Sequence, residues 1–267
     1  MRFFYMAIIL LVLSLAGCQT HPLESTPLDQ VVVEAYLYEN QPVDQIRLSH
    51  PFSISSPQGQ NSPITEAQVF LSRNGMEYQL LPYPGEPGRY HAEDPALVVS
   101  SGDLFELKIL YKEKIISAQT RVPSVPRIAR ISNDTLSVGS SKTTDGVPLE
   151  IVIELPDGQP ADLFFVNIRN IEQFPVPLPD FLFLTTGPQP IWSQPFANLN
   201  YQLNLQGLTH QGRHQVKVTS MNREYAEFYA FQTQGDQSFT PIPSNIRNGL
   251  GIFTAFSVSA PTYIFVR

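Results

Sequence analysis

Residues 31–122 alternate apolar and polar side chains over short runs, with turn-forming residues between one run and the next. A period of two indicates strands that bury one face. The pair Asn74-Gly75 stands between two of the runs and predicts a two-residue hairpin, because both residues tolerate a positive φ. The predicted strands of this part are 31–38, 45–50, 67–72, 78–81, 89–92, 105–111 and 115–121.

Two prolines, Pro123 and Pro126, interrupt this pattern and predict a stiff linker at a domain boundary. Further short apolar runs follow, and they predict strands at 128–131, 149–155, 163–168, 201–205, 215–220, 251–257 and 262–266. Residues 174–196 are rich in proline and large apolar side chains. That segment is predicted to be a long irregular excursion or a cover over a second core.

One stretch has a helical period. In residues 222–233, Tyr225, Phe228 and Tyr229 recur at a spacing of three and four, and Gly235 follows as a stop. This predicts a single amphipathic helix whose aromatic stripe packs against a core. A stripe that lines a ligand site is the alternative. The sequence therefore predicts a mostly β fold: an N-terminal immunoglobulin-like β-sandwich at 30–122, then a second β-rich domain at 127–267 that contains one short amphipathic helix.

The amino terminus has the features of an export signal. A basic start is followed by an uncharged apolar run that is shorter than the roughly 20 residues of a membrane-spanning helix. The signal peptide is predicted at 1–17 and a tether at 18–29. Leu15, Ala16, Gly17 and Cys18 resemble the lipobox of bacterial lipoproteins, which implies that Cys18 is acylated, with palmitate among its chains. A secretory peptide with an incidental cysteine is the alternative.

Composition excludes several classes of function. With 17 Lys+Arg against 24 Asp+Glu and a pI of about 5.2, the chain lacks a basic stripe that could bind a run of phosphates, so no nucleic-acid partner is expected. The single cysteine forbids an intramolecular disulfide and a thiolate metal cluster. Gly249 and Gly251 lack the third glycine of a dinucleotide loop, and no cofactor is expected.

Two pairs of titratable residues were tested for catalytic or metal-binding chemistry. Glu150 and Glu154 lie on one face of a predicted strand, where an acid/base dyad and a solvated outer face are both possible. His210 and His214 are four residues apart, but Gly212 and a following strand argue against a zinc-binding helix. We therefore expect solvated loop histidines, no metal site and no catalytic residues.

Four aromatic residues of the proline-rich segment are candidates for a partner or ligand surface. They are Phe181, Phe183, Trp192 and Phe196. Exposed rings of this kind form a stacking surface for a sugar or an apolar groove for a partner. The alternative is that they fill the second core beneath the excursion.

The order of these features resembles a family of Bacteroidota lipoproteins known as domain of unknown function 4249. The front of the resemblance runs from VVVEAY at residues 31–36 to Val122-Pro123. Its most specific block is SNIRNGLGIF at residues 244–253, in which two glycines predict a tight turn leading into a buried strand. The family residues of this block are Ser244, Asn245, Ile246, Gly249, Gly251 and Phe253. Asn248 stands where a glycine is more usual.

The resemblance implies an outer-membrane lipoprotein, often encoded beside a TonB-dependent receptor, with no established reaction. We therefore expect a non-catalytic binding or accessory component that reaches the membrane through its lipid anchor, facing either the periplasm or the exterior. Strand addition at an edge of the first sandwich is one possible mode of partner binding. A surface adhesin or structural component is the main alternative, and a hydrolase acting on glycans or peptides is the less favoured one.

Overall fold

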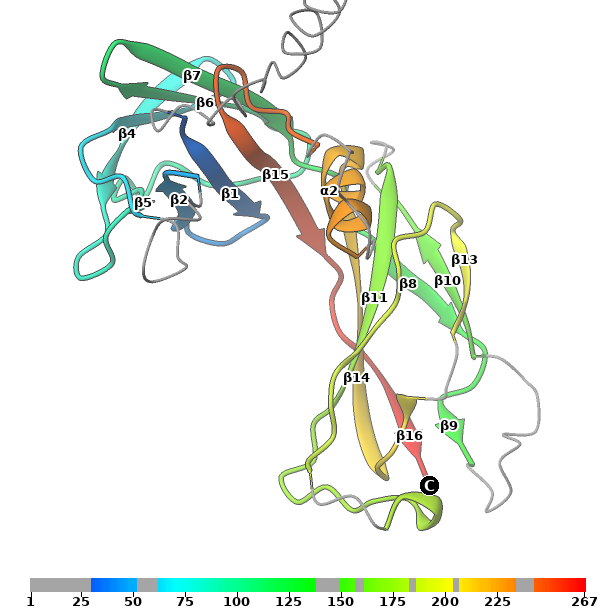
Figure 1. Cartoon of the computed structure of the whole chain (residues 1–267). Helices are drawn as coiled ribbons and strands as arrows, with labels where there is room; N and C mark the ends of the chain where they lie inside the picture. The colour runs from blue at the N-terminus through cyan, green and yellow to red at the C-terminus, as the bar shows by residue number, and fades with distance from the viewer. Residues whose placement is uncertain are drawn as a thin grey trace, which may run out of the picture.

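The computed structural model describes residues 30–51, 62–137, 149–156, 161–182, 186–203, 207–233 and 243–267. The chain forms two β-sandwiches that meet end to end, with one short helix at their junction (Figure 1). Leu15, Ala16, Gly17, Cys18 and the tether at 18–29 lie outside the described residues, as does Phe183. The mostly β fold with a single α-helix among the described residues confirms the predicted fold class.

The first sandwich contains the seven predicted strands at nearly the predicted positions. One sheet is ordered β15-β1-β2-β5 and the other β4-β3-β6-β7, with β4 also pairing with β5. The strands are β1 (Val32–Tyr38), β2 (Gln45–Ser49), β3 (Gln68–Arg73), β4 (Met76–Pro82), β5 (Arg89–His91), β6 (Leu104–Tyr111) and β7 (Lys114–Arg121). Asn74 and Gly75 connect β3 to β4 with φ angles of 49° and 89°, which confirms the hairpin.

The second sandwich places a sheet built on β11, β14 and β16 against a three-stranded sheet ordered β13-β10-β8. Its elements are β8 (Arg127–Ile131), β9 (Thr135–Leu136), β10 (Leu149–Glu154), β11 (Leu163–Asn170), η1 (Pro179–Phe181), β12 (Ile191–Trp192), β13 (Asn200–Leu203), β14 (Gly212–Met221), α2 (Arg223–Thr233), β15 (Leu250–Val258) and β16 (Thr262–Val266). The short strands β9 and β12 were not predicted. The helix was predicted, and its observed start differs by one residue.

Strand β15 belongs to both sandwiches. Leu250 to Phe256 pair in parallel with β1, and Phe256 to Val258 pair antiparallel with β14. Residues 251–257 are all buried, because neighbours cover both faces of the strand. The predicted boundaries at 30–122 and 127–267 remain a prediction, to which the structure adds that the carboxyl-terminal part of the chain completes the first sandwich.

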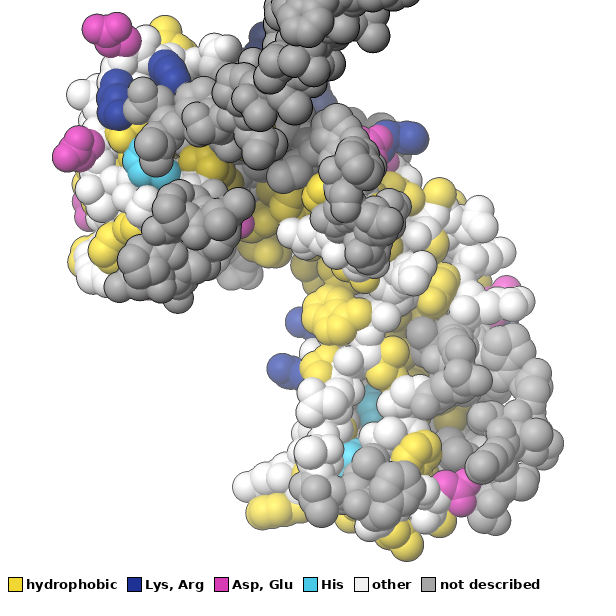
Figure 2. Space-filling model, viewed as in Figure 1, with side chains coloured by type: hydrophobic (Ala, Val, Ile, Leu, Met, Phe, Trp, Pro, Cys, Tyr) yellow, Lys and Arg dark blue, Asp and Glu magenta, His cyan; other side chains and the backbone are white. Residues whose placement is uncertain are grey.

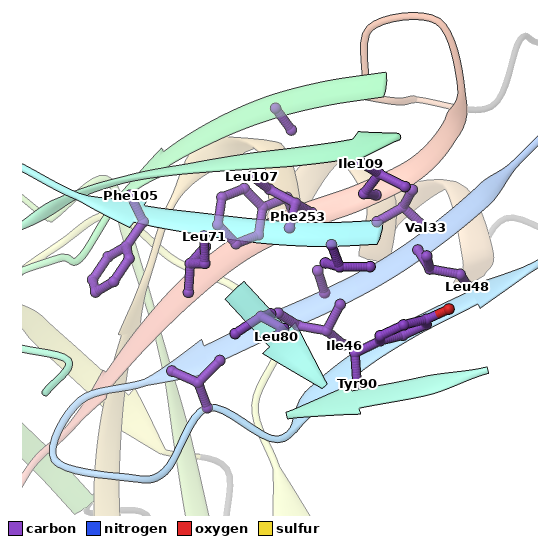
Figure 3. Packing of buried hydrophobic residues seen from close by; sticks show 14 of the residues in the cluster. Val33, Ile46, Leu48, Leu71, Leu80, Tyr90, Phe105, Leu107, Ile109 and Phe253 are labelled. Carbon is purple, nitrogen blue, oxygen red and sulfur yellow. The ribbon is translucent and has the colours of Figure 1, made fainter. Parts of the chain in front are cut away.

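Each sandwich has its own hydrophobic core. The first core takes Phe253 and Ala255 from β15 in addition to side chains from β1 to β7. Figure 3 shows Phe253 among Leu71 and Leu107 of the facing sheet. The second core lies between β11, β14 and β16 on one side and β10 on the other. A polar or truncated side chain at Phe253 would therefore destabilise the first sandwich from a position far along the chain.

The predicted linker is buried and hydrogen-bonded. Pro123 and Ser124 carry carbonyls that accept hydrogen bonds from the hydroxyls of Ser257 and Ser220, at 2.7 and 2.5 Å. Both serines are fully buried, one on β15 and one on β14. These bonds tie the linker to β15, which belongs to both sandwiches, and to β14 of the second sandwich, and so restrict how the two sandwiches can move against each other.

No helix among the described residues is both long and apolar enough to cross a bilayer.

Candidate functional site: an aromatic groove at the junction

A groove with a volume of about 640 Å³ lies where the two sandwiches meet. We call it the aromatic groove. Figure 2 shows hydrophobic side chains gathered at this junction. Strands β1, β11, β12, β14 and β15 and helix α2 all contribute to the lining, which consists of Tyr38, Phe165, Asn167, Trp192, Ser193, Pro195, Lys217, Thr219, Met221, Tyr225, Tyr229, Phe256 and Val258.

The floor of the groove is the outer face of the sheet whose inner face covers the second core. Along β11, Phe164 and Val166 point into that core, so the intervening Phe165 and Asn167 point into the groove. Strand β14 alternates in the same way and presents Lys217 to the groove. Cross-strand pairing puts Trp192, Asn167 and Lys217 in one row across three neighbouring strands.

The rings that line the groove hold one another in place. Phe165 and Trp192 lie with ring centroids 5.3 Å apart, and Tyr38 stacks on Phe256 at 5.3 Å. Tyr225, from the first turn of α2, meets Phe256 edge-on at 4.7 Å. Offset and edge-on arrangements of this kind are favourable ring contacts. Trp192 still exposes 59% of its surface, so its ring is available to a ligand.

The polar side chains of the groove are one amine, one amide and several hydroxyls. Ser193 Oγ accepts a hydrogen bond from the Val166 amide at 2.8 Å, which fixes the loop after β12. Lys217 is half-buried and makes no ion pair with a described residue, and no carboxylate lines the groove among the described residues. Burial raises the pKa of Tyr38 and of Tyr225, so both phenols stay neutral and can donate hydrogen bonds.

The aromatic stripe of α2 was predicted to pack against a core, and the structure shows that it does not. No residue of the helix is buried. Tyr225 and Tyr229 line the groove, and Tyr225 also contacts Tyr36 edge-on at 6.3 Å. The helix lies against β15 at the junction, where the surface it covers is the end of one strand and not the interior of a sandwich (Figure 1). A three-and-four spacing identifies the apolar face of a helix but not what that face meets.

The four aromatic residues predicted as a partner surface are placed differently from one another. Phe181 and Phe196 are partly buried against the second core, and Phe196 stacks on Tyr201 at 4.1 Å. Trp192 is exposed in the groove, and Phe183 lies outside the described residues. Sequence reasoning singled out Tyr225 and Tyr229 but missed the groove rings of Tyr38, Phe165 and Phe256. Phe165 carried a signal, since it occupies an outward position in an alternating strand.

The family block SNIRNGLGIF builds the first sandwich. Asn245 forms two hydrogen bonds with the backbone of Phe253, at 2.7 and 2.9 Å. Ser244 Oγ accepts from the Ile246 amide, and Ile246 is buried in the first core. Gly251 has a φ of 104°, and a Cβ there would lie 2.0 Å from the Val33 carbonyl oxygen. Only glycine permits β15 to approach β1 this closely.

Gly249 and Asn248 of the same block also have residue types that their backbone positions favour. A Cβ at Gly249 would lie 3.0 Å from the Val31 carbonyl oxygen, which favours glycine there. Asn248 has a φ of 60°, a conformation that asparagine tolerates best after glycine, so its departure from the usual glycine is accommodated. Its side-chain amide donates to the Ile115 carbonyl on β7 at 2.9 Å. The block therefore has a structural role.

The two glutamates tested as an acid dyad are explained by the solvated-face alternative. Glu150 and Glu154 form ion pairs with Arg130 and Arg127 on the neighbouring strand β8. Ile151, between them, is fully buried in the second core. The carboxylates thus project from the outer face of β10 and are neutralised by cross-strand partners.

The two histidines are buried, so the expectation of solvated loop histidines was wrong. Strand β14 begins at Gly212, and His214 therefore shares the inward face with Val216. Its partners assign a neutral ring, in which Nδ1 donates to the Gly212 carbonyl at 3.0 Å and Nε2 accepts from the Asn170 amide at 3.3 Å. Burial lowers the pKa of His214.

His210 lies just before this strand and is covered by the proline-rich excursion. Its backbone forms a bridge with Pro177, and its Nδ1 lies 2.8 Å from the Thr209 hydroxyl. No group of three or more potential metal-ligating side chains was found among the described residues. The histidine pair is therefore explained by packing and hydrogen bonding within the second sandwich.

The fold and the groove define a class: a mostly β protein of two sandwiches that share a strand and form an aromatic groove at their junction. The match to a known family is specific. The family described as Domain of unknown function (DUF4249) matches residues 20–261, and the chain belongs to it. No curated protein matches the chain.

Two solved structures give similarities of a general kind. One is the crystal structure of the chicken CNTN1 FN1-FN3 domains, with 11% identity and a TM-score of 0.22 over 88% of this chain. The match spans 63% of that structure's chain, so the present chain covers less than two thirds of it. The other is a chimeric titin Z1Z2 carrying an exogenous decorin peptide, with 13% identity and a TM-score of 0.21 over 89% of this chain and 97% of the titin chain.

Proposed function

We propose that this protein is a lipid-anchored, non-catalytic binding component of the outer membrane, and that the aromatic groove is its ligand site. The observation that carries the proposal is the composition of the groove, in which six aromatic side chains surround an amine, an amide and hydroxyls. Binding sites for small ligands commonly combine an apolar lining with a few placed polar groups. The buried linker and the shared strand β15 keep the groove preformed, which lowers the cost of binding.

The chemistry of the groove favours binding over catalysis. General acid–base catalysis requires a titratable group poised to exchange a proton near neutral pH, most often a histidine or a carboxylate. Among the described residues, the groove is lined by neither of these types. The acids that could have formed a dyad, Glu150 and Glu154, are held in ion pairs elsewhere.

The anchor in this proposal is a lipid on Cys18. Two or three acyl chains would hold the protein at a bilayer without a transmembrane helix. The segment 18–29 would let the first sandwich stand at most about 40 Å from the lipid, because an extended chain spans roughly 3.3–3.6 Å per residue. Confinement to the membrane raises the effective concentration of the groove near a receptor in the same bilayer, so even a weak affinity suffices.

The groove is a better candidate for partner or ligand binding than the edge of the first sandwich. The outer edge of β7 is occupied, since Ser117 exchanges two backbone hydrogen bonds with Arg247. The Arg121 carbonyl accepts from the side chain of Asn222 at 2.8 Å, and the Ile115 carbonyl accepts from Asn248. Strand addition at this edge would have to displace these partners.

A surface adhesin or structural component is the second candidate, and one observation favours it. The proline-rich excursion exposes three large apolar side chains, with 80% of Phe174, 71% of Leu182 and 55% of Val176 accessible to solvent. Backbone hydrogen bonds from Leu178 to Thr209 and from Gln211 to Val176 hold this loop in place. A rigid loop with exposed apolar side chains is suited to contact with another protein.

A matched pair of variants separates the two candidates. Tagged full-length protein is purified from outer membranes in mild detergent, as wild type, as Trp192→Ala and as Leu182→Ala, and co-purifying proteins are identified by mass spectrometry. We expect a TonB-dependent receptor with the wild type and with Leu182→Ala, and its loss with Trp192→Ala. The reverse result would favour the adhesin, and the absence of any receptor from the wild type would refute the accessory role.

The anchor is tested independently. Mass spectrometry of the mature amino terminus is expected to find an acylated Cys18, and Cys18→Ser is expected to leave the envelope fraction. An unmodified thiol, or a Cys18→Ser protein that still fractionates with membranes, would refute anchoring by lipid.

A further inference from the structure

We infer that the ligand of the aromatic groove is an acidic carbohydrate, whose sugar ring stacks on Trp192 and whose carboxylate or sulfate group binds Lys217. This inference rests on the proposed function, because it names the chemical class that the same groove takes. Three features of the groove support it: an exposed ring held on a rigid strand, hydrogen-bonding side chains beside that ring, and a lysine without a counter-ion.

The stacking platform is the indole of Trp192. Strand β12 carries it and pairs with β11, and the backbone of Ser193 donates to the Val166 carbonyl at 2.9 Å. Phe165 supports one side of the indole, while 59% of the Trp192 surface faces solvent. A sugar ring has an apolar face of C–H groups that matches such a surface, and little ordering of the protein is needed when the ring is already fixed.

The rim of the platform is polar. Asn167 lies beside Trp192 across the sheet, and Thr219 and the phenol of Tyr229 line the same groove. Asn167 Nδ2 donates to the Ile191 carbonyl at 3.4 Å, but a purely apolar occupant would leave the Asn167 side-chain oxygen and the hydroxyls of Thr219 and Tyr229 without hydrogen-bond partners. That loss costs about 1–3 kcal/mol for each buried group. Hydroxyl groups around a sugar ring both donate and accept hydrogen bonds, so a carbohydrate satisfies the rim and the platform together.

The charge of the groove selects an acidic ligand. Lys217 is half-buried and has no ion-pair partner among the described residues, although the chain carries more acids than bases. Six other described cations each contact a carboxylate, namely Arg47, Arg73, Arg89, Lys108, Arg127 and Arg130. An ammonium group in an acid-free groove attracts an anion, and the overall charge of −7 would otherwise disfavour one.

The register of the sheet sets the spacing between the two contacts. Trp192 pairs with Asn167, and Asn167 pairs with Lys217, so two strand spacings separate the tryptophan from the lysine. Neighbouring strands lie about 4.8 Å apart, which gives roughly 10 Å between the two backbones. A single sugar ring with an acidic substituent spans a distance of this order once the side chains reach toward it.

The chain provides its own reporter for the test, because Trp192 is the only tryptophan. The purified protein is titrated with trigalacturonate, with a sulfated galactan trisaccharide and with neutral galactotriose, and the fluorescence of Trp192 is followed. The titrations are repeated with Lys217→Met and with Lys217→Arg, and at two salt concentrations. Lys108→Met serves as the matched control, since it removes a lysine from the first sandwich that pairs with Glu77.

We expect the wild type to bind at least one acidic trisaccharide about tenfold or more tightly than galactotriose, as the loss of a charge-assisted hydrogen bond would predict. Lys217→Met should remove this preference, Lys217→Arg should retain most of it, and Lys108→Met should not change it. Raising the salt concentration should weaken only the acidic ligands. A response to the carboxylate alone or to the sulfate alone supports the inference and identifies the acidic group.

Equal or tighter binding of galactotriose, or an unchanged preference in Lys217→Met, would overturn the acidic class. The absence of any fluorescence response to the three trisaccharides would overturn the carbohydrate class. Neither outcome refutes the proposed function, which is tested separately by the co-purification of a receptor and by the acylation of Cys18. The salt dependence of the wild type keeps the test valid should Lys217→Met fold poorly.

Discussion

Replacing Gly251 with alanine tests the contact that joins the first and last parts of the chain. Gly251 begins the buried stretch of β15, has a φ of 104° and lies against the backbone of Val33 on β1. An alanine Cβ would lie 2.0 Å from the Val33 carbonyl oxygen, whereas ordinary contacts begin near 3.4 Å. Strand β15 must therefore move by more than an ångström, or change its backbone conformation.

The expected cost has two parts. An L-residue at this φ costs on the order of 1–3 kcal/mol in backbone strain alone. Moving β15 away from β1 also stretches the parallel ladder and loosens Phe253, which is fully buried in the first core. Hydrogen bonds weakened in the ladder contribute about 0.5–1.5 kcal/mol each, and the loss of packing adds to them. We expect a total destabilisation of about 3–5 kcal/mol.

The assay is urea unfolding followed by circular dichroism, with Gly75→Ala as the matched control. Gly75 also has a positive φ, at 89°, but a Cβ there would meet nothing within 4 Å. The control therefore measures backbone strain without the collision, and we expect it to cost about 1–2 kcal/mol. If Gly251→Ala were no more destabilising than Gly75→Ala, the close approach of β15 to β1 would be refuted.

Three further predictions follow from contacts described above. Asn245→Ala should lower the free energy of unfolding by about 2–3 kcal/mol, because the backbone N–H and C=O of Phe253 lose their partners; a thermal unfolding shift of less than one degree would contradict this role. Because the pKa of His214 is lower in the folded protein than its ordinary 6.5, the unfolded chain binds the proton more readily. The contribution of His214 to the free energy of unfolding should therefore be fully present above pH 6.5 and be lost as the pH falls below that value. His214→Gln should show a smaller fall in urea titrations between pH 7 and 5, and parallel curves would contradict the assignment. Glu154→Gln should change stability by only about 0–1 kcal/mol, since its ion pair with Arg127 is exposed; a larger loss in the same urea assay would show that this pair is more important than its exposure implies.

Local patterns were sufficient to predict most of the strands. Alternation with a period of two depends only on which face of a strand is buried, and both sandwiches have one buried and one open face along most of their length. The Asn74-Gly75 hairpin was predictable for the same reason, because its φ angles are a property of the two residues themselves. The two-residue strands β9 and β12 are too short to produce a period.

Contacts between distant segments were not predictable from these patterns. The run GIFTAFS at residues 251–257 lacks alternation, which is consistent with burial on both faces. The run alone does not identify its neighbours, which are β1 on one side and β14 on the other. The aromatic groove also depends on contacts between distant segments of the chain. Tyr38, Phe165 and Phe256 come from three separate strands, and only the register of β1, β11, β14 and β15 brings them together.

The position of His214 shows how a small error in a boundary changes the reading of a residue. A strand beginning at 215 leaves His214 in a loop. The observed β14 begins at Gly212, so His214 lies on the strand and points to the same buried face as Val216. Extending the alternation backward by one residue pair would have placed the imidazole in the core.

The pairing of β1 with β15 also determines when the protein can fold. During synthesis the amino-terminal sandwich emerges from the ribosome first, but one strand of its sheet is encoded more than 200 positions later, at Leu250 to Phe256. Until those residues arrive, the open edge of β1 and the space for Phe253 remain exposed, and such unpaired edges promote aggregation. A truncation near the carboxyl terminus would therefore leave both sandwiches incomplete.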